Sequence, residues 1–175
     1  MAALWLNRRV SPDAIAYVAF SDKKTMAQTL TSLYYHVVFS TKNRVELIRP
    51  DVEDELYAYI GGILNNHDSK LLIGNGTQNH SHLLISPYKN LLIPDTVGKI
   101  KRDSSKWIKT KGGMLAKFGW QDGYSVFTVG HTQLDAVKKY IANQKEHHKK
   151  VLFEDEMRDF YGRYEIDFDE KYLWD

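Results

Sequence analysis

The chain has 175 residues, enough for one domain with its own hydrophobic core and too few for two ordinary domains and a linker. With 43% hydrophobic and 26% charged residues, its composition excludes a disordered or fibrous protein, and its lack of cysteine excludes disulfides, thiolate metal sites and a cysteine nucleophile. The net charge is only +2, but residues 154–175 hold nine acidic and three basic residues, so the rest carries 21 basic against 13 acidic residues and suits a polyanionic partner.

The first 25 residues differ in pattern from the rest of the chain. A short apolar run, residues 2–6, comes before Arg8 and Arg9, which is the wrong order for a signal peptide. No stretch approaches the ~20 apolar residues that span a bilayer. Strongly patterned sequence begins just after Met26, so we expect residues 1–25 to be an N-terminal extension. We also expect a cytoplasmic protein without a membrane partner, which the absence of cysteine fits.

Hydrophobic periodicity and turn residues predict four strands and three helices after this extension. In chain order they are a strand over 33–40, a helix from Pro50 to about 65, a strand over 70–73 broken by Gly74-Asn75-Gly76, a strand over 80–86, a helix from Pro94 to Gly112, a strand over 124–129, and a helix from Thr132, as N-cap, to about His148. We expect residues 26–153 to form one domain on which the acidic tail, residues 154–175, packs.

The element order βαββαβ, followed by a further helix, is typical of an α+β fold. It predicts the ferredoxin-like split-βαβ arrangement, an antiparallel sheet with helices on one face. The additional C-terminal helix would then carry the residues around Tyr140.

His80 and His82 are two residues apart in a predicted strand, so their side chains point to the same face. Two imidazoles at that separation can chelate one divalent ion when another element adds a ligand. Two hydrogen-bonded or surface histidines would give the same pattern.

Tyr140 and Gln144 are four residues apart in the last predicted helix, so they lie one turn apart on one face. A tyrosine hydroxyl with a pKa near ~10 needs a metal-bound phosphate or a base before it can attack at neutral pH. Gln144 could add a third metal ligand, but His147 or His148 could replace it. Tyr140 is equally compatible with an aromatic core position.

Basic residues lie on and after the second predicted helix, and a further group lies beside Tyr140. Cations on the outer face of a helix can hold phosphates, although a solvated surface explains the same pattern. Trp107, at the spacing of the apolar residues, is expected in the core. The candidates for DNA binding are Lys99, Lys101, Arg102, Lys106, Lys109, Lys139 and Lys145.

Five stretches carry a resemblance to a known family, and they occur in the order 35–44, 80–85, 105–107, 120–124 and 140–144. Together they resemble the HUH single-tyrosine transposases of the smallest bacterial insertion sequences, which include the REP-associated tyrosine transposases. The resemblance runs from about Leu33 to Trp174. It implies a ferredoxin-like fold and a homodimer, in which the tyrosine helix can complete the partner subunit's active site.

The resemblance also implies site roles. His80, His82 and Gln144 would bind Mg²⁺ or Mn²⁺, and Tyr140 would be the nucleophile that forms a 5′-phosphotyrosine. The substrate would be single-stranded DNA with hairpins at the element ends, cut and rejoined by transesterification. Two alternatives stay open: a divalent-metal hydrolase using His80, His82 and His148 without a covalent intermediate, and a non-catalytic module that binds single-stranded nucleic acid.

Ser81 departs from the family pattern, which usually has a bulky apolar residue between the histidines. Residues 77–79, Thr-Gln-Asn, also replace the common Met-Pro-Asp or Met-Pro-Asn. We expect Ser81 to face away from the metal, so chelation survives. The lost core side chain would cost about 2 kcal/mol or more unless neighbours fill the space, which would weaken the transposase.

Overall fold

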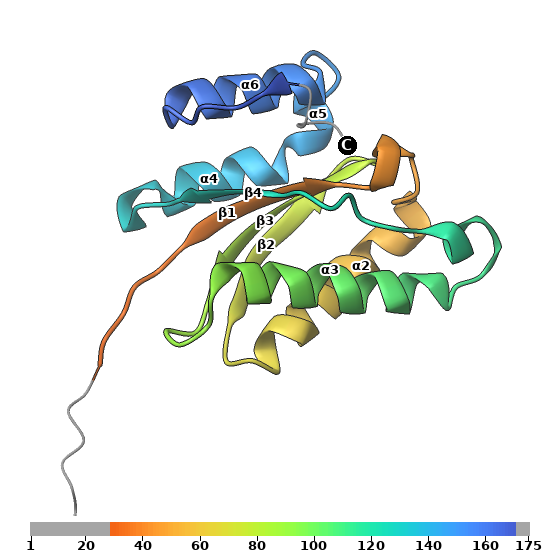
Figure 1. Ribbon diagram of the computed structural model, residues 1–175, viewed down its shortest axis with the longest axis horizontal. Helices are drawn as coiled ribbons and strands as arrows, with labels where there is room; N and C mark the ends of the chain where they lie inside the picture. The colour runs from red at the N-terminus through yellow and green to blue at the C-terminus, as the bar shows by residue number, and fades with distance from the viewer. Residues whose placement is uncertain (1–28, 171–175) are drawn as a thin grey trace, which may run out of the picture. The chain divides into compact units, whose positions relative to one another are not determined.

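The chain folds around a four-stranded antiparallel sheet, which the computed structural model shows with helices on both faces (Figure 1). The structure describes residues 29–170, so the predicted extension, Met26 and the end of the acidic tail, 171–175, lie outside it. The elements are β1 (Tyr35–Ser40), η1 (Lys42–Arg44), α2 (Pro50–Asn65), β2 (Lys70–Gly76), β3 (His80–Ser86), α3 (Ile93–Lys109), η2 (Gly113–Lys117), β4 (Ser125–Thr128), η3 (His131–Gln133), α4 (Leu134–Ala142), α5 (Gln144–His147) and α6 (Phe153–Arg163).

The strand order is β2-β3-β1-β4, with every neighbouring pair antiparallel. This order and the intervening helices α2 and α3 confirm the predicted α+β, ferredoxin-like fold. Register places Ser40 of β1 opposite His80 and Val38 opposite His82. The two histidines therefore lie on β3, one of the two central strands of the sheet.

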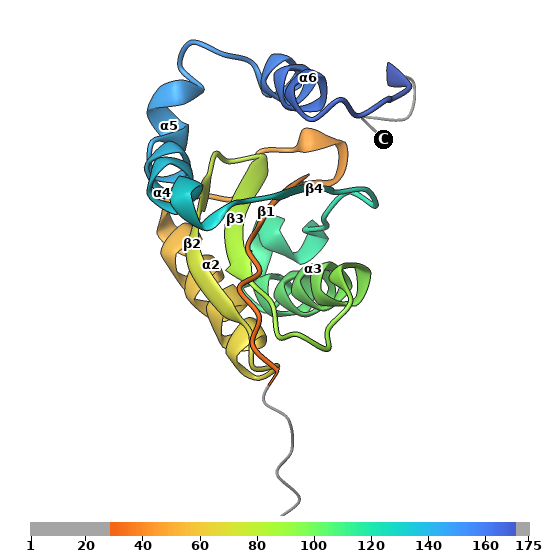
Figure 2. The same ribbon diagram turned by 90° about the vertical axis from the view of Figure 1, so that its left-hand side faces the viewer.

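Alternation along the strands divides the core into two layers. One face of β1 and β3 packs against α2 and α3, with Val37 and Leu83 fully buried there. The other face packs against α4 through Leu84 and against α6 through Val38. Figures 1 and 2 show α3 and α6 on opposite sides of the sheet. The helices of the split βαβ units, α2 and α3, thus cover one face of the sheet, and α4, which contains Tyr140, covers the other.

β2 continues through the glycines that were expected to break it, and it ends at Gly76. A Cβ on Gly74 would lie 2.6 Å from the Tyr57 ring, and a Cβ on Gly76 would lie 2.2 Å from the carbonyl oxygen of His80. These glycines therefore permit close approach within a strand rather than a turn.

The last predicted helix is divided in the structure. It begins with η3, where Gln133 accepts a hydrogen bond from the backbone of Gly130, so the prediction of Thr132 as N-cap is wrong. The chain leaves the α-helical conformation at Asn143, which separates α4 from α5. Asn75 Nδ2 donates at 2.9 Å to the carbonyls of Ile141 and Ala142, which lie at the end of α4.

Ser81 faces the α2 side of the sheet and is fully buried. Its hydroxyl lies 3.2 Å from that of Tyr57, a buried residue of α2. Tyr57 therefore fills the space beside this small side chain and satisfies its polar atom, so the expected weakening has a structural compensation.

Part of the acidic tail forms α6, which was not predicted as a helix. Met157 and Tyr161 of α6 are buried against Val38 and Phe127. None of the helices within residues 29–170 has the length and apolar character needed to cross a membrane.

Candidate active site

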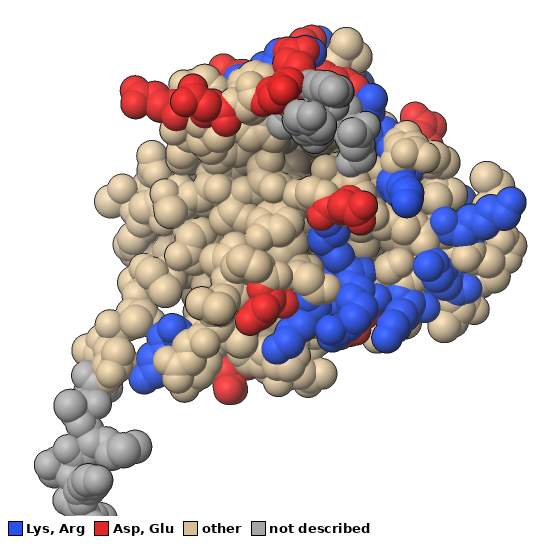
Figure 3. All heavy atoms as spheres, viewed as in Figure 1, with Lys and Arg blue, Asp and Glu red and all other residues tan. Residues whose placement is uncertain are grey.

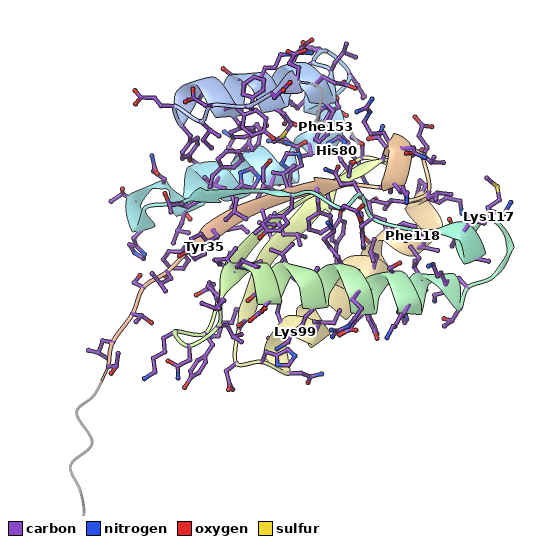
Figure 4. All side chains as sticks on the ribbon, viewed as in Figure 1. Tyr35, His80, Lys99, Lys117, Phe118 and Phe153 are labelled. Carbon is purple, nitrogen blue, oxygen red and sulfur yellow. The ribbon has the colours of Figure 1, made fainter. Side chains whose placement is uncertain are left out.

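His80 and His82 are buried side by side on the α4 and α6 face of β3. His80 Nδ1 lies 2.7 Å from Asn79 Oδ1 and 2.9 Å from Thr77 Oγ1, which leaves Nε2 to face the interior. Phe153 stacks on the His80 ring at 4.3 Å between centroids (Figure 4). Burial and then the neighbouring His82 lower the pKa of His80 well below its ordinary value, so the imidazole is neutral.

His36 orients His82 from the adjacent strand. Its Nε2 lies 3.0 Å from His82 Nδ1, and burial lowers the pKa of His36 to about 3. Burial also lowers the pKa of His82, against the influence of Glu156. When His82 Nδ1 donates to His36, the lone pair of His82 lies on Nε2, the atom that faces the site. Sequence reasoning did not select His36 because its contact depends on strand register.

Tyr140 and Gln144 meet at one carboxylate, that of Glu156 in α6. The Tyr140 hydroxyl donates to Glu156 Oε1, and Gln144 Nε2 donates to the same oxygen at 3.0 Å. Burial and then Glu156 raise the pKa of Tyr140 above its ordinary value. Tyr140 also contacts core residues of the α4 face, so it is both a packed aromatic and a site residue. The structure thus brings the four predicted site residues together.

Glu156 was not selected from the sequence, yet it lies at the centre of the site and is 4% exposed. Its Oε2 lies 3.3 Å from His82 Nε2 and 3.2 Å from His148 Nε2. Burial alone would raise the pKa of Glu156, but the adjacent His148 and His82 hold the pKa well below its ordinary range. The same carboxylate raises the pKa of His148 against the effect of burial. A helical repeat of apolar residues that begins just before the acidic tail, at Phe153, Met157 and Phe160, was the available signal.

His148 completes a cluster with His80, His82 and Glu156, whose potential ligand atoms all lie within 4.8 Å of one another. His80 Nε2 and His148 Nε2 are 3.0 Å apart. His148 Nδ1 donates to the carbonyl of Val151 at 2.9 Å, so its Nε2 lone pair also faces the site.

The donor set fits a cation. Among the described residues, His82 Nε2, Gln144 Oε1 and Glu156 Oε2 are buried and make no hydrogen bond. Neutral imidazole nitrogens, an amide oxygen and a carboxylate oxygen are ligands for divalent metal ions. Several acceptors facing one another without a donor are costly unless a cation lies among them.

A cavity of about 910 Å³ between α4 and α6 gives access to Tyr140. Its walls include His36, Phe160, His147 and Glu156. The nucleophile candidate is therefore accessible from one side, while the histidine pair below it is fully enclosed.

The predicted DNA-binding residues fall into two groups. Figure 3 shows basic side chains gathered over α3 and acidic ones over α6. A groove of about 490 Å³ along α3 is lined by four of the predicted cations, Lys101, Arg102, Lys106 and Lys109. Lys99, labelled in Figure 4, also belongs to α3 but does not line this groove. The α3 group lies on the sheet face opposite the histidines, and Trp107 packs against the core as predicted.

Two of these cations have partners. Lys101 Nζ donates to the carbonyls of Asp122 and Gly123 at 2.8 and 2.9 Å. Arg102 binds the adjacent Asp103. Within residues 29–170, Lys106 and Lys109 form no ion pair, and both side chains are exposed, so their charges face solvent.

Lys139 and Lys145 lie on the same side of the sheet as Tyr140. Lys139 and Tyr140 line one hollow of about 560 Å³. Lys145 lines another with His148, and its ammonium is 2.5 Å from Glu53. The site therefore has basic residues at two of its margins.

Comparison with known families identifies the same part of the chain. Residues 29–144 match the family described as "Transposase IS200 like". The match includes His80, His82, Tyr140 and Gln144 and ends before α6. The ISDra2 transposase TnpA of Deinococcus radiodurans is 26% identical over 123 residues, which cover 65% of this chain and 85% of that relative.

Two solved structures have similar folds. A Deinococcus radiodurans R1 protein described as a transposase has a TM-score of 0.53 and 24% identity, covering 67% of this chain and 95% of its own. A REP-associated tyrosine transposase bound to a REP hairpin has a TM-score of 0.53 and 12% identity, covering 72% of this chain and 76% of its own. At these identities the likeness establishes the shared fold.

Proposed function

Because the chain belongs to the IS200-like transposase family, we propose that it cuts and rejoins single-stranded DNA through a covalent bond to Tyr140. The reaction is a metal-dependent transesterification at hairpin-containing ends of a mobile element.

The observation that carries the proposal is the position of the Tyr140 hydroxyl. It binds one oxygen of Glu156, whose other oxygen lies 3.3 Å from His82 Nε2. A core tyrosine also finds a partner for its hydroxyl, but here the partner is the carboxylate of the cluster that could hold a metal ion, so the hydroxyl lies beside that cluster.

We assign His80, His82 and Gln144 as metal ligands, because all three are buried together, His82 Nε2 and Gln144 Oε1 make no hydrogen bond, and His80 Nδ1 is held by Asn79 so that Nε2 faces the same space. The ion is Mg²⁺ or Mn²⁺. Bound there, it would neutralise charge on a scissile phosphate and orient that phosphate. His36, Asn79 and Thr77 hold the two rings so that Nε2 faces the site.

The chemistry of this chain's own residues is a phosphoryl exchange. The Tyr140 oxygen attacks phosphorus, the bond from phosphorus to the 3′ oxygen breaks, and the phenol proton ends on the released 3′-hydroxyl. The product is a 5′-phosphotyrosine. Attack by another 3′-hydroxyl reverses these bond changes and returns the proton to Tyr140. No ATP is required, because each step exchanges one phosphodiester for another.

DNA binding is assigned to the two basic groups. The solved relative with a bound REP hairpin supports a hairpin as the substrate of this chain. We place the hairpin along the α3 groove, using Lys101, Arg102, Lys106, Lys109 and the neighbouring Lys99.

One end of the α3 groove lies beside the strand that neighbours the histidine strand. Its wall includes Gln121, whose Oε1 accepts a hydrogen bond from the backbone of Ser40, and Ser40 is opposite His80. A strand leaving the groove at this end would reach the edge of the active site. Lys139 and Lys145 would then contact its phosphates beside Tyr140.

The test uses labelled single-stranded DNA from the flanks of the gene, with and without Mn²⁺. We expect a denaturation-resistant protein-DNA adduct with the wild-type protein and none with Tyr140→Phe or in EDTA. Cleavage at the wild-type rate by Tyr140→Phe would refute the proposal. A protein that binds these strands equally well in EDTA and with His80→Ala, and never cleaves them, would instead be a binding module. The predicted homodimer is tested separately, by sedimentation.

The 3.0 Å contact between His80 and His148 favours a second candidate. A divalent-metal hydrolase would use His80, His82 and His148 and cleave DNA with water. It predicts product with a free 5′ end from Tyr140→Phe and loss of activity in His148→Gln. The transferase predicts that label stays on the wild-type protein after denaturation.

A further inference from the structure

The Glu156 carboxylate lies among the rings of His80, His82 and His148, with all the potential ligand atoms within 4.8 Å of one another. In the described part of the chain, all the ion pairs of Glu156 are with histidines, namely His82, His147 and His148. A buried carboxylate without a lysine or arginine partner needs another source of positive charge.

The spacing of the donor atoms matches metal coordination. Ligands at ~2.1 Å from an octahedral ion are about 3 Å apart when they are adjacent. Glu156 Oε2 lies 3.3 Å from His82 Nε2 and 3.2 Å from His148 Nε2, and His148 Nε2 lies 3.0 Å from His80 Nε2. Glu156 Oε2 also makes no hydrogen bond.

The position of Glu156 is fixed by packing rather than by the histidines alone. Met157, the next residue of α6, is buried with Val38 of β1, and Phe153 stacks on His80. The carboxylate is therefore held against the sheet by the same helix face that closes the core.

We propose that Glu156 is a carboxylate ligand of the divalent cation, which makes α6 part of the metal centre. The inference rests on the proposed function, which supplies the cation. It extends the site beyond the residues matched by the family, which end at Gln144. It also links nucleophile and metal, because Oε1 of the same carboxylate binds the Tyr140 hydroxyl.

The experiment measures metal binding by the full chain without DNA. Metal-stripped protein is titrated with Mn²⁺ by calorimetry, and water-proton relaxation reports the water molecules on the bound ion. We expect Glu156→Gln to bind Mn²⁺ at least about tenfold more weakly. We also expect higher relaxivity, because water replaces the lost ligand. Glu154→Gln, the same charge change on the same helix, should match the wild type.

Two outcomes overturn the inference. One is wild-type affinity and relaxivity in Glu156→Gln. The other is weaker binding with unchanged relaxivity, which would mean that the charge acts from outside the coordination shell. Circular dichroism in EDTA checks the fold. If Glu156→Gln does not fold, Glu156→Asp withdraws the carboxylate by one methylene without changing charge, and the same two measurements apply.

Failure of the proposed function gives a different result. The Mn²⁺ titration requires neither DNA nor the strand-transfer reaction, so its result does not depend on whether an adduct forms. Loss of affinity in Glu156→Gln, with no adduct formed by the wild-type protein, would sustain the metal inference and refute the transferase. An adduct formed by the wild-type protein, together with unaltered Mn²⁺ binding in Glu156→Gln, would support the transferase and refute the metal inference.

Discussion

The hydrogen bond between Ser81 and Tyr57 predicts strong coupling between these residues. Both hydroxyls are buried, 3.2 Å apart, and on the sheet face opposite the metal cluster. Tyr57→Phe leaves the Ser81 hydroxyl without this partner, and Ser81→Ala does the same to Tyr57, at a cost of about 1–3 kcal/mol each. The double variant leaves neither polar atom buried alone and should lose only about 1 kcal/mol.

Urea unfolding in EDTA measures this double-mutant cycle. We expect a coupling energy of at least about 1 kcal/mol, and additivity to within ~0.5 kcal/mol would refute the reasoning. Tyr59→Phe, on the same helix but 38% exposed, is the matched control and should change stability by less than ~0.5 kcal/mol. Ser81→Ala should also leave Mn²⁺ affinity unchanged, because its side chain points away from His80 and His82.

Three other predictions concern backbone packing, pH and DNA. Gly76→Ala should cost about 1–3 kcal/mol in unfolding free energy and weaken Mn²⁺ binding, since its Cβ would lie 2.2 Å from the carbonyl oxygen of His80. Gly62→Ala is the control, because a Cβ added there would have no neighbouring atom within 4 Å, and it should be neutral or stabilising. Equal melting temperatures for the Gly76→Ala and Gly62→Ala variants would contradict this prediction. Folding lowers the pKa of His36 from 6.5 to about 3, so on acidification the unfolded chain is protonated first and stability falls between these values. Between about pH 7 and about pH 5 in EDTA, this protonation of His36 should lower the free energy of unfolding by about 2 kcal/mol. His36→Gln should remove that part of the pH dependence. An unchanged pH dependence in His36→Gln would show that His36 is not its source. Lys106→Ala should reduce the slope of log affinity against log salt concentration for a DNA hairpin by roughly 0.9. Lys70→Ala, a change in β2, should leave the slope unchanged. The same change of slope in both variants would mean that the hairpin does not bind along α3.

The sequence predicted those parts of the site that depend on local geometry. His80 and His82 share a face because side chains alternate in any strand, and Tyr140 lies near Gln144 because residues four apart meet in any helix. The break at Asn143 does not separate Tyr140 from Gln144, because both side chains bind Glu156.

Glu156 could not be predicted because its position depends on tertiary packing. The surrounding acidic residues indicate a solvated tail, and only the burial of Met157 and Tyr161 determines which side of α6 faces the sheet. His36 was missed for a related reason, since its contact with His82 requires the register between β1 and β3.

The fold could be predicted from periodicity, but two signals were ambiguous. Glycine ends a strand in one context and permits close packing in another, and the Tyr57 ring that distinguishes them at Gly74 comes from a different element. The basic residues of α3 and those near Tyr140 were both predicted to bind DNA. The sheet separates the two groups, which sequence distance alone did not reveal.

The two hydrogen bonds from Asn75 are relevant to the question of which subunit's metal ion Tyr140 would act with. Asn75 is opposite His82 in the sheet and also holds the end of α4, so a single residue fixes the spacing between nucleophile and ligands. If α4 moved to a neighbouring subunit, both hydrogen bonds would break, and the carbonyls of Ile141 and Ala142 would lose their donor. We therefore predict that Tyr140 acts with the metal ligands of its own subunit, so mixing Tyr140→Phe chains with His82→Ala chains should yield no adduct.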